Sequence, residues 1–162
     1  MNTIEIKKKN AISAYNKADT KGKQLLENLL GKDNLLPIDI TERVKIFEDV
    51  FEVLEDLPHD ISSLLEYKGK NPDMLSAQAY LKLTLIARAL NEGWEPDWTN
   101  SNEYKYMPYF KHKSGFGLSF DGIDRWDTVT TVGSRLCYKS RELAEYAATQ
   151  FADIYNDYLT IK

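Results

Sequence analysis

The residues with the greatest chemical potential in this sequence are the aromatic rings and lysines that alternate between positions 94 and 113. Rings stack on planar bases or sugars and lysines neutralise phosphates, a combination that proteins use to hold single-stranded nucleic acid. On this basis the ligand-binding candidates are Trp94, Trp98, Tyr104, Lys105, Tyr106, Tyr109, Lys111 and Lys113. The same rings also suit the packed face of a small sheet. The sequence leaves both interpretations open.

Reactive side chains form a second and weaker set. His112 and Cys137 could act as a base and a nucleophile if adjacent strands brought them together. However, a lone cysteine in a β-type run is typically a buried small hydrophobe. Asp121, Asp124 and Asp127 are spaced like the start of a calcium loop, but the glycine and the final glutamate of that loop are missing. We predict no catalytic residue, no metal site and no cofactor, and hence a protein that is not an enzyme.

Composition narrows the class of protein. The 162 residues carry a net charge of −4, include one cysteine, and contain no apolar run of the roughly 18 residues that a membrane span requires. A disulfide within the chain and a cysteine-based zinc site are therefore excluded. The N-terminal run MNTIEIKKKN has no apolar stretch after its lysines, unlike a signal peptide. We expect a cytoplasmic protein of a bacterial host cell, neither secreted nor inserted in a membrane.

The elements that must position these residues are helices on either side of a short β region. Apolar periodicity predicts helices over 4–30, about 41–56 and 74–91, strands over 103–111, 116–120 and 128–138, and a last helix after Ser140. The helix over 74–91, capped by Asp73, is the most apolar and is expected at the centre of the core. The predicted fold is α+β: N-terminal helices, a central apolar helix, a three-stranded antiparallel meander and a C-terminal helix.

Charge is unevenly distributed along the chain. Residues 7–23 contain six lysines and one aspartate, a balance of +5, whereas residues 41–60 contain seven acidic and two basic residues, a balance of −5. The two segments could pair within one molecule or between copies of the chain. The basic segment could also bind nucleic acid or an acidic partner, or be a solvated helix face. For domain organisation we expect a helical arm at 1–36 and an α+β domain at 37–162, or one domain over 1–162.

Three runs resemble a known protein family: ARALNEGWEPDWTNSNEYKYMPYF at 87–110, VGSRLCYKSRELAEYAATQF at 132–151 and ITERVKIFEDVFEVL at 40–54. The family consists of uncharacterised proteins encoded by phages and mobile elements of gut Bacteroides-type bacteria. The resemblance implies a phage or mobile-element setting. It also implies that the runs at 87–110 and 132–151 form a C-terminal module. It implies no activity, catalytic residue or cofactor.

The function expected from these observations is a non-enzymatic binding or interaction module of phage or mobile-element origin. A protein partner or self-association is the first expectation, and single-stranded nucleic acid on an aromatic and basic sheet face is the alternative. A self-assembling structural protein, or a small enzyme acting through His112 or the three aspartates, are further alternatives. Whether the rings are buried or line a groove decides between them.

Overall fold

The computed structural model describes residues 5–35, 39–54, 57, 61–113 and 117–160. The chain divides into two compact units, residues 1–39 and 40–162. The sequence places the boundary between residues 36 and 37, which lie outside the described residues. None of the helices in the described ranges combines the length and the apolar composition that crossing a lipid bilayer would need.

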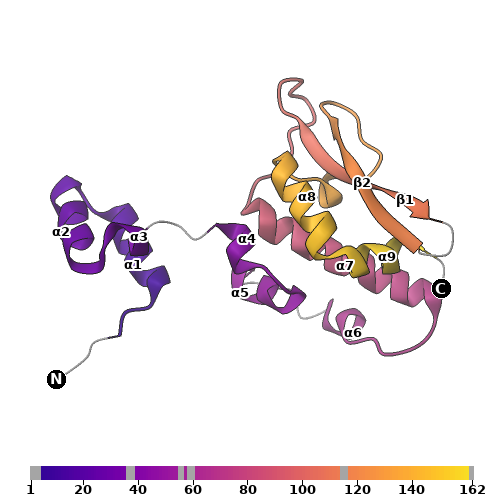
Figure 1. The fold of residues 1–162 in the computed structure, drawn as a ribbon, viewed down its shortest axis with the longest axis horizontal. Coiled ribbons are helices and arrows are strands. Elements are labelled where there is room, and N and C mark those ends of the chain that lie inside the picture. The colour runs from indigo at the N-terminus through magenta and orange to yellow at the C-terminus, as the bar shows by residue number, and fades with distance from the viewer. Residues whose placement is uncertain (1–4, 36–38, 55–56, 58–60, 114–116, 161–162) are drawn as a thin grey trace. The chain divides into compact units, whose positions relative to one another are not determined.

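Within its described residues, the first unit contains α1 (Lys8–Lys17), α2 (Thr20–Leu30) and α3 (Lys32–Leu35) (Figure 1). Helix α2 begins where the Asp19 carboxylate accepts the N–H of Gly22 at 2.8 Å, and it ends at Gly31, whose φ of 79° suits a residue without a Cβ. The hydroxyl of Tyr15 donates to Glu27 at 2.5 Å and joins α1 to α2. Helix α2 has no buried side chain, and Leu25 and Leu29 on it are exposed.

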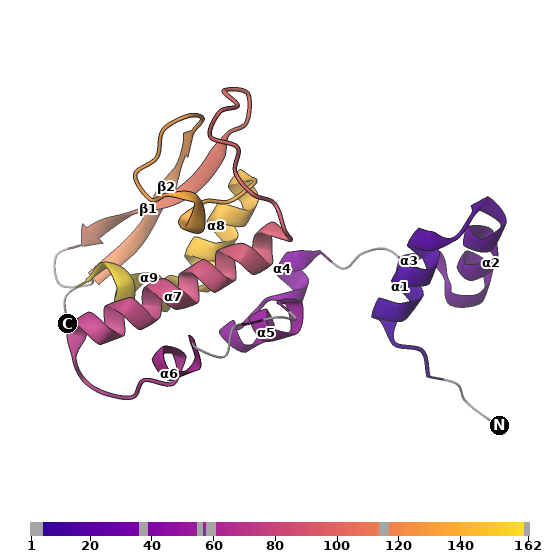
Figure 2. The same cartoon turned by 180° about the vertical axis from the view of Figure 1, so that it is seen from behind.

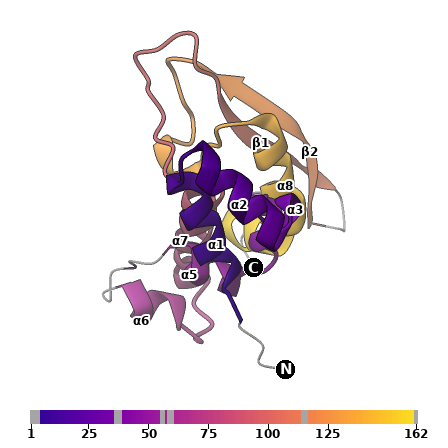
Figure 3. The same cartoon turned by 90° about the vertical axis from the view of Figure 1, so that its left-hand side faces the viewer.

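Helix α7 (Pro72–Asn91) is the centre of the second unit. Asn71 caps it instead of the predicted Asp73: its side chain accepts the N–H groups of Asp73 and Met74, at 3.0 and 3.1 Å. Pro72 follows in the first turn, where a missing N–H leaves no hydrogen bond unmade. The views in Figures 1, 2 and 3 show the β-strands and α6 (Ser62–Leu65) on opposite sides of α7. Contact on two sides is what its broad apolar surface predicts.

The predicted helix over residues 41–56 is wrong in its described part, which forms α4 (Ile40–Arg43), the 3-10 turn η1 (Phe47–Asp49) and α5 (Val50–Val53). The side chain of Asp49 explains the break. Its carboxylate accepts the backbone N–H groups of Lys45 and Ile46, at 2.8 and 2.9 Å, so these groups are not used in a continuous helix. Apolar residues on both sides of the break, Val44 and Val50, are nevertheless fully buried.

The β region is a hairpin of β1 (Lys105–Lys113) and β2 (Gly117–Trp126). The strands are antiparallel, with Lys105 opposite Trp126, and a bulge interrupts the register between Tyr109 and Phe110. Helix α8 (Arg141–Gln150) lies against both strands, and α7 lies against α8 and α9 (Ala152–Leu159). Phe110 packs on Tyr155 of α9, with ring centroids 4.8 Å apart. One face of the hairpin is therefore part of the core.

The three-stranded meander is wrong, because the described sheet has two strands and residues 128–138 do not form a third. Only Tyr138 pairs with β1, exchanging backbone hydrogen bonds of 3.0 and 2.8 Å with Tyr106. On its other side this segment meets a side chain of α7. Asn91 donates to the carbonyl of Cys137 at 2.9 Å and accepts the N–H of Lys139 at 3.0 Å. A helix side chain thus replaces the next strand.

The predicted last helix is two helices. Ser140 starts α8 as predicted, accepting the N–H of Leu143 at 3.3 Å. At Phe151 the backbone leaves helical geometry, with φ −114° and ψ 32°, and α9 begins at the next residue. The α+β class stands, with a hairpin in place of the meander.

Candidate functional site

The predicted candidate Lys105 lies inside the protein and is fully buried. Its ammonium group donates to the backbone carbonyls of Asp97, Asn100 (3.4 Å), Glu103 (2.7 Å) and Asp127 (3.0 Å). It also lies 3.2 Å from the Glu103 carboxylate and 5.3 Å from the centre of the Trp98 ring. We call this arrangement the Lys105 cage. Since a buried ammonium group is stable only when oxygen atoms surround it, the cage holds loop 97–103 and residue 127 together.

The other predicted candidates on the hairpin do not form one open face. Tyr104 is exposed, with the guanidinium of Arg125 over its ring at 4.5 Å, and Tyr109 is also exposed. Tyr106 is half-buried against the core. Lys111 pairs with Asp121 at 2.7 Å. The side chain of Lys113 lies outside the described residues. The remaining two candidates, Trp94 and Trp98, belong to the loop before β1.

The reactive side chains do not converge. His112 is exposed on β1, and Cys137 is buried, so that desolvation raises the pKa of its thiol to about 11. Asp121 is occupied by Lys111, and Asp127 accepts the N–H of Thr128, which lowers the pKa of its carboxyl group. Among the described residues, no three histidine, cysteine or acidic side chains gather where a metal ion could bind.

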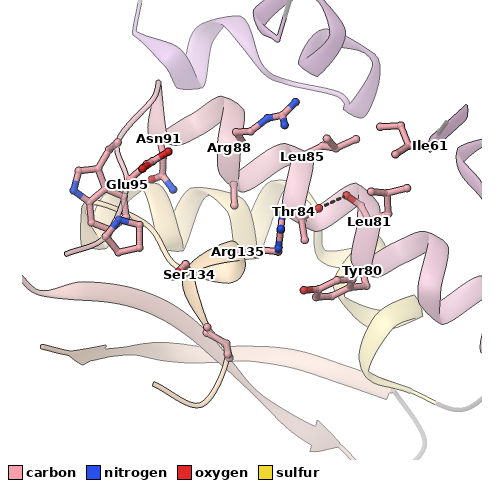
Figure 4. Close-up of a pocket in the computed structure, with 15 residues that line it drawn as sticks. Ile61, Tyr80, Leu81, Thr84, Leu85, Arg88, Asn91, Glu95, Ser134 and Arg135 are labelled. Carbon is pink, nitrogen blue, oxygen red and sulfur yellow. Dashed lines mark hydrogen bonds between the residues drawn. The ribbon is translucent and has the colours of Figure 1, made fainter. Parts of the chain in front are cut away.

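A cleft of about 810 Å³ lies beside α7 (Figure 4), and we call it the α7 cleft. Helix α7 provides Tyr80, Leu81, Thr84, Leu85, Ala87, Arg88 and Asn91. Trp94, Glu95 and Pro96 line it from the loop after α7, Val132 to Arg135 line it from the segment before α8, and Ile61 adds an apolar side chain. The volume is within the range of small-molecule sites, about 300–1,000 Å³. Of the eight sequence-predicted candidates, only Trp94 lines this cleft.

The two loop segments that line the α7 cleft are fixed by side-chain hydrogen bonds. The indole N–H of Trp98 donates to the hydroxyl of Ser134 at 2.7 Å and links the segments to one another. The hydroxyl of Thr130 accepts the N–H groups of Val132 and Gly133, at 3.1 and 2.8 Å. Beyond them, the Lys105 cage holds the stretches of chain next to both segments. The lining is therefore built in advance of any ligand.

The charged side chains that line the α7 cleft are two arginines and one glutamate. Arg88 and Arg135 are both exposed, and within the described part of the chain neither guanidinium makes a hydrogen bond or an ion pair. Figure 4 shows Arg135 extending from its segment toward Thr84 on α7. The amide of Asn91, by contrast, is engaged with residues 137 and 139. Recognition of a charged ligand in the cleft thus falls to the two arginines and to Glu95.

The sequence pointed to Trp94 but missed the arginines. Thr84 and Arg88 stand four residues apart on α7, a spacing that places them on the same helix face, but Gln78 and Lys82 are polar as well and the pair does not stand out. Arg135 carried no such signal, because its segment was predicted as a strand.

Comparisons with known proteins add no relative. A scan of the chain against protein-family models, and searches of curated proteins and of solved structures, find no match.

Proposed function

We propose that the protein is a non-enzymatic binding module and that the α7 cleft is its ligand site. The observation that carries the proposal is the cleft itself: about 810 Å³, with its loop segments held by internal hydrogen bonds. Preformed concave sites with apolar walls and a few polar groups are the usual form of a small-molecule site. The polar groups here are suited to holding a charged ligand and include no base placed beside a nucleophile.

The wider setting is part of the same proposal. The resemblance of runs 40–54, 87–110 and 132–151 would place the module in a phage or mobile element, acting in the cytoplasm of the bacterial host. Single-stranded nucleic acid remains an alternative prediction for the hairpin, but two of its lysines are already paired, Lys105 in its cage and Lys111 with Asp121. Titration of a labelled oligonucleotide at low salt, where phosphate contacts are strongest, tests that alternative.

A cleft-filling variant tests the main proposal. Thr84 is half-buried in the lining, and its hydroxyl donates to the carbonyl of Leu81 at 2.8 Å. Thr84→Trp would fill the hollow, and we expect it to remove binding of the uncharged fluorescent probe N-phenyl-1-naphthylamine. Thr149→Trp is the matched control, because Thr149 makes the same kind of bond, to Glu145 at 2.8 Å, on the exposed side of α8. Equal binding by the wild type and the Thr84 variant would refute the proposal.

A further inference from the structure

We infer that the α7 cleft selects an oxyanion carried on a planar apolar body, such as an aromatic carboxylate, sulfonate or phosphate. The inference rests on the proposed function of the cleft and names the class of its ligand. It starts from the two arginines. Several other cations of the second unit have oxygen partners: Lys105 has its cage, Lys111 has Asp121, and Lys139 has Glu92 at 3.2 Å.

Arg88 and Arg135 differ from those cations because their donors are open toward solvent and have no acceptor among the described residues. A guanidinium group offers five N–H donors in a rigid planar array, which matches the oxygen atoms of a carboxylate, sulfonate or phosphate. Both arginines line the cleft, Arg88 from α7 and Arg135 from the segment before α8. In Figure 4 Arg135 extends toward Thr84, whereas Arg88 extends away from Arg135, so Arg135 is the main donor to an anion beside Thr84.

The remaining lining defines the body of the ligand. Tyr80 and Trp94 contribute aromatic rings, and Leu81, Leu85 and Val132 are apolar. Flat apolar groups bind between such side chains because burial removes apolar area from water and rings stack on rings. An inorganic anion alone would leave these surfaces in contact with water. The lining therefore favours an anion attached to a ring system over a free inorganic anion.

Glu95 should affect the affinity for an anion in the opposite direction to the two arginines. It lines the same cleft, near Asn91 in Figure 4, and has no ion-pair partner among the described residues. A negative side chain repels an anionic ligand, so its removal should strengthen binding, whereas removal of either arginine should weaken it. A ligand held by apolar contact alone would respond to neither change.

The test compares two probes of nearly the same shape. 8-Anilinonaphthalene-1-sulfonate carries a sulfonate group, and N-phenyl-1-naphthylamine is the uncharged counterpart. We expect the wild type to bind the sulfonate about fivefold more tightly, the effect of one partly exposed charge-assisted contact. Arg135→Gln should remove about this factor for the sulfonate only, Arg88→Gln should remove part of it, and Glu95→Gln should raise sulfonate affinity about twofold. Added salt should reduce the preference.

Two control variants locate the probe. Arg125→Gln removes an exposed arginine outside the cleft and should leave both affinities unchanged. Leu29→Gln removes an exposed leucine of α2, one of the apolar side chains outside the cleft that these dyes could contact, and should also change neither affinity. Binding of both probes at equal affinity, unaffected by Arg135→Gln but lost in Thr84→Trp, would overturn the anion inference and leave the binding module intact. Binding that survives Thr84→Trp would overturn both.

Discussion

The Lys105 cage and the α7 cleft are two sites built from cations, and they use those cations in opposite ways. In the cage a single ammonium group is enclosed by four carbonyls, one carboxylate and one indole ring, with nothing left exposed. In the cleft two guanidinium groups stand at the surface with no protein acceptor among the described residues. The number of satisfied donors, rather than the residue type, separates a structural cation from one available to a ligand.

The two sites lie on the same loops. Residues 97 and 127, held in the cage, adjoin the segments that carry Trp94 and Arg135 to the cleft. In the Lys105 cage the hydrogen bonds fix the chain. In the neighbouring α7 cleft the donors of Arg88 and Arg135, which have no acceptor among the described residues, are free to bind a ligand.

Lys105→Met should produce the largest loss of stability. It keeps most of the apolar stem and removes the charge, so four carbonyls and the Glu103 carboxylate lose the ammonium group as a donor. We expect the free energy of unfolding to fall by about 3 kcal/mol, because removing one partner of a buried ionic cluster leaves the rest uncompensated. Urea unfolding followed by tryptophan fluorescence measures it. Lys111→Met, which removes an exposed pairing with Asp121, is the control, and a similar small loss in both variants would contradict the distinction.

Asn91→Ala should have the next largest effect. Asn91 lines the cleft, but its side-chain amide is already hydrogen-bonded within the protein. It donates to the carbonyl of Cys137 and accepts the N–H of Lys139. Loss of both bonds leaves a carbonyl and an N–H group unpaired beside a buried helix end, and we expect a cost of about 2 kcal/mol. Asn91→Asp sharpens the test, because a carboxylate still accepts from Lys139 but repels the carbonyl of Cys137. Thermal unfolding should rank the three proteins wild type, then Ala, then Asp; an Asp variant as stable as wild type would argue against this role.

Alkaline pH should weaken the region around the cage through Cys137. Desolvation raises the pKa of its thiol from 9.0 to about 11, an effect that nearby Lys105 partly opposes. The unfolded chain therefore loses this proton at lower pH than the folded chain. The contribution of the thiol to the free energy of unfolding is fully present below pH 9 and is lost as the pH rises toward 11. Cys137→Ala should show a shallower decline over that window in urea midpoints measured at successive pH values. Parallel declines in the two proteins would exclude the thiol as the cause.

Sequence reasoning succeeded where one local pattern decides the outcome. The apolar surface of α7 and the capping by Ser140 follow from spacing and side-chain chemistry, and both are present. It failed where a side chain bonds to the backbone in a way that apolar spacing does not reveal. Asp49 interrupts the helix predicted over 41–56 through bonds to residues three and four positions away, and Asn91, 46 positions before Cys137, takes the place of a third strand.

The same limit applies to the candidate site. Lys105 looked like an exposed ligand for phosphates, because alternation with aromatic residues does not reveal which face a loop will cover. Arg135 lies in the α7 cleft because of the fold of residues 130–136. In this segment Thr130 accepts backbone N–H groups, and Ser134 accepts the indole N–H of Trp98. No pattern within that short segment encodes a bond to a residue 36 positions away.

Arg135→Gln should have the smallest effect on stability and so complete the comparison. Its guanidinium has no partner among the described residues, and exposed substitutions without partners change the free energy of unfolding by less than about 0.5 kcal/mol. Urea unfolding of Arg135→Gln and of Lys105→Met measures the smallest and the largest expected loss in the free energy of unfolding. Since the chain gains nothing in stability from Arg135, a strong loss of sulfonate binding in a variant of unchanged stability would be a direct effect on the ligand. A destabilised Arg135→Gln would instead show that the open cation is structural, as Lys105 is.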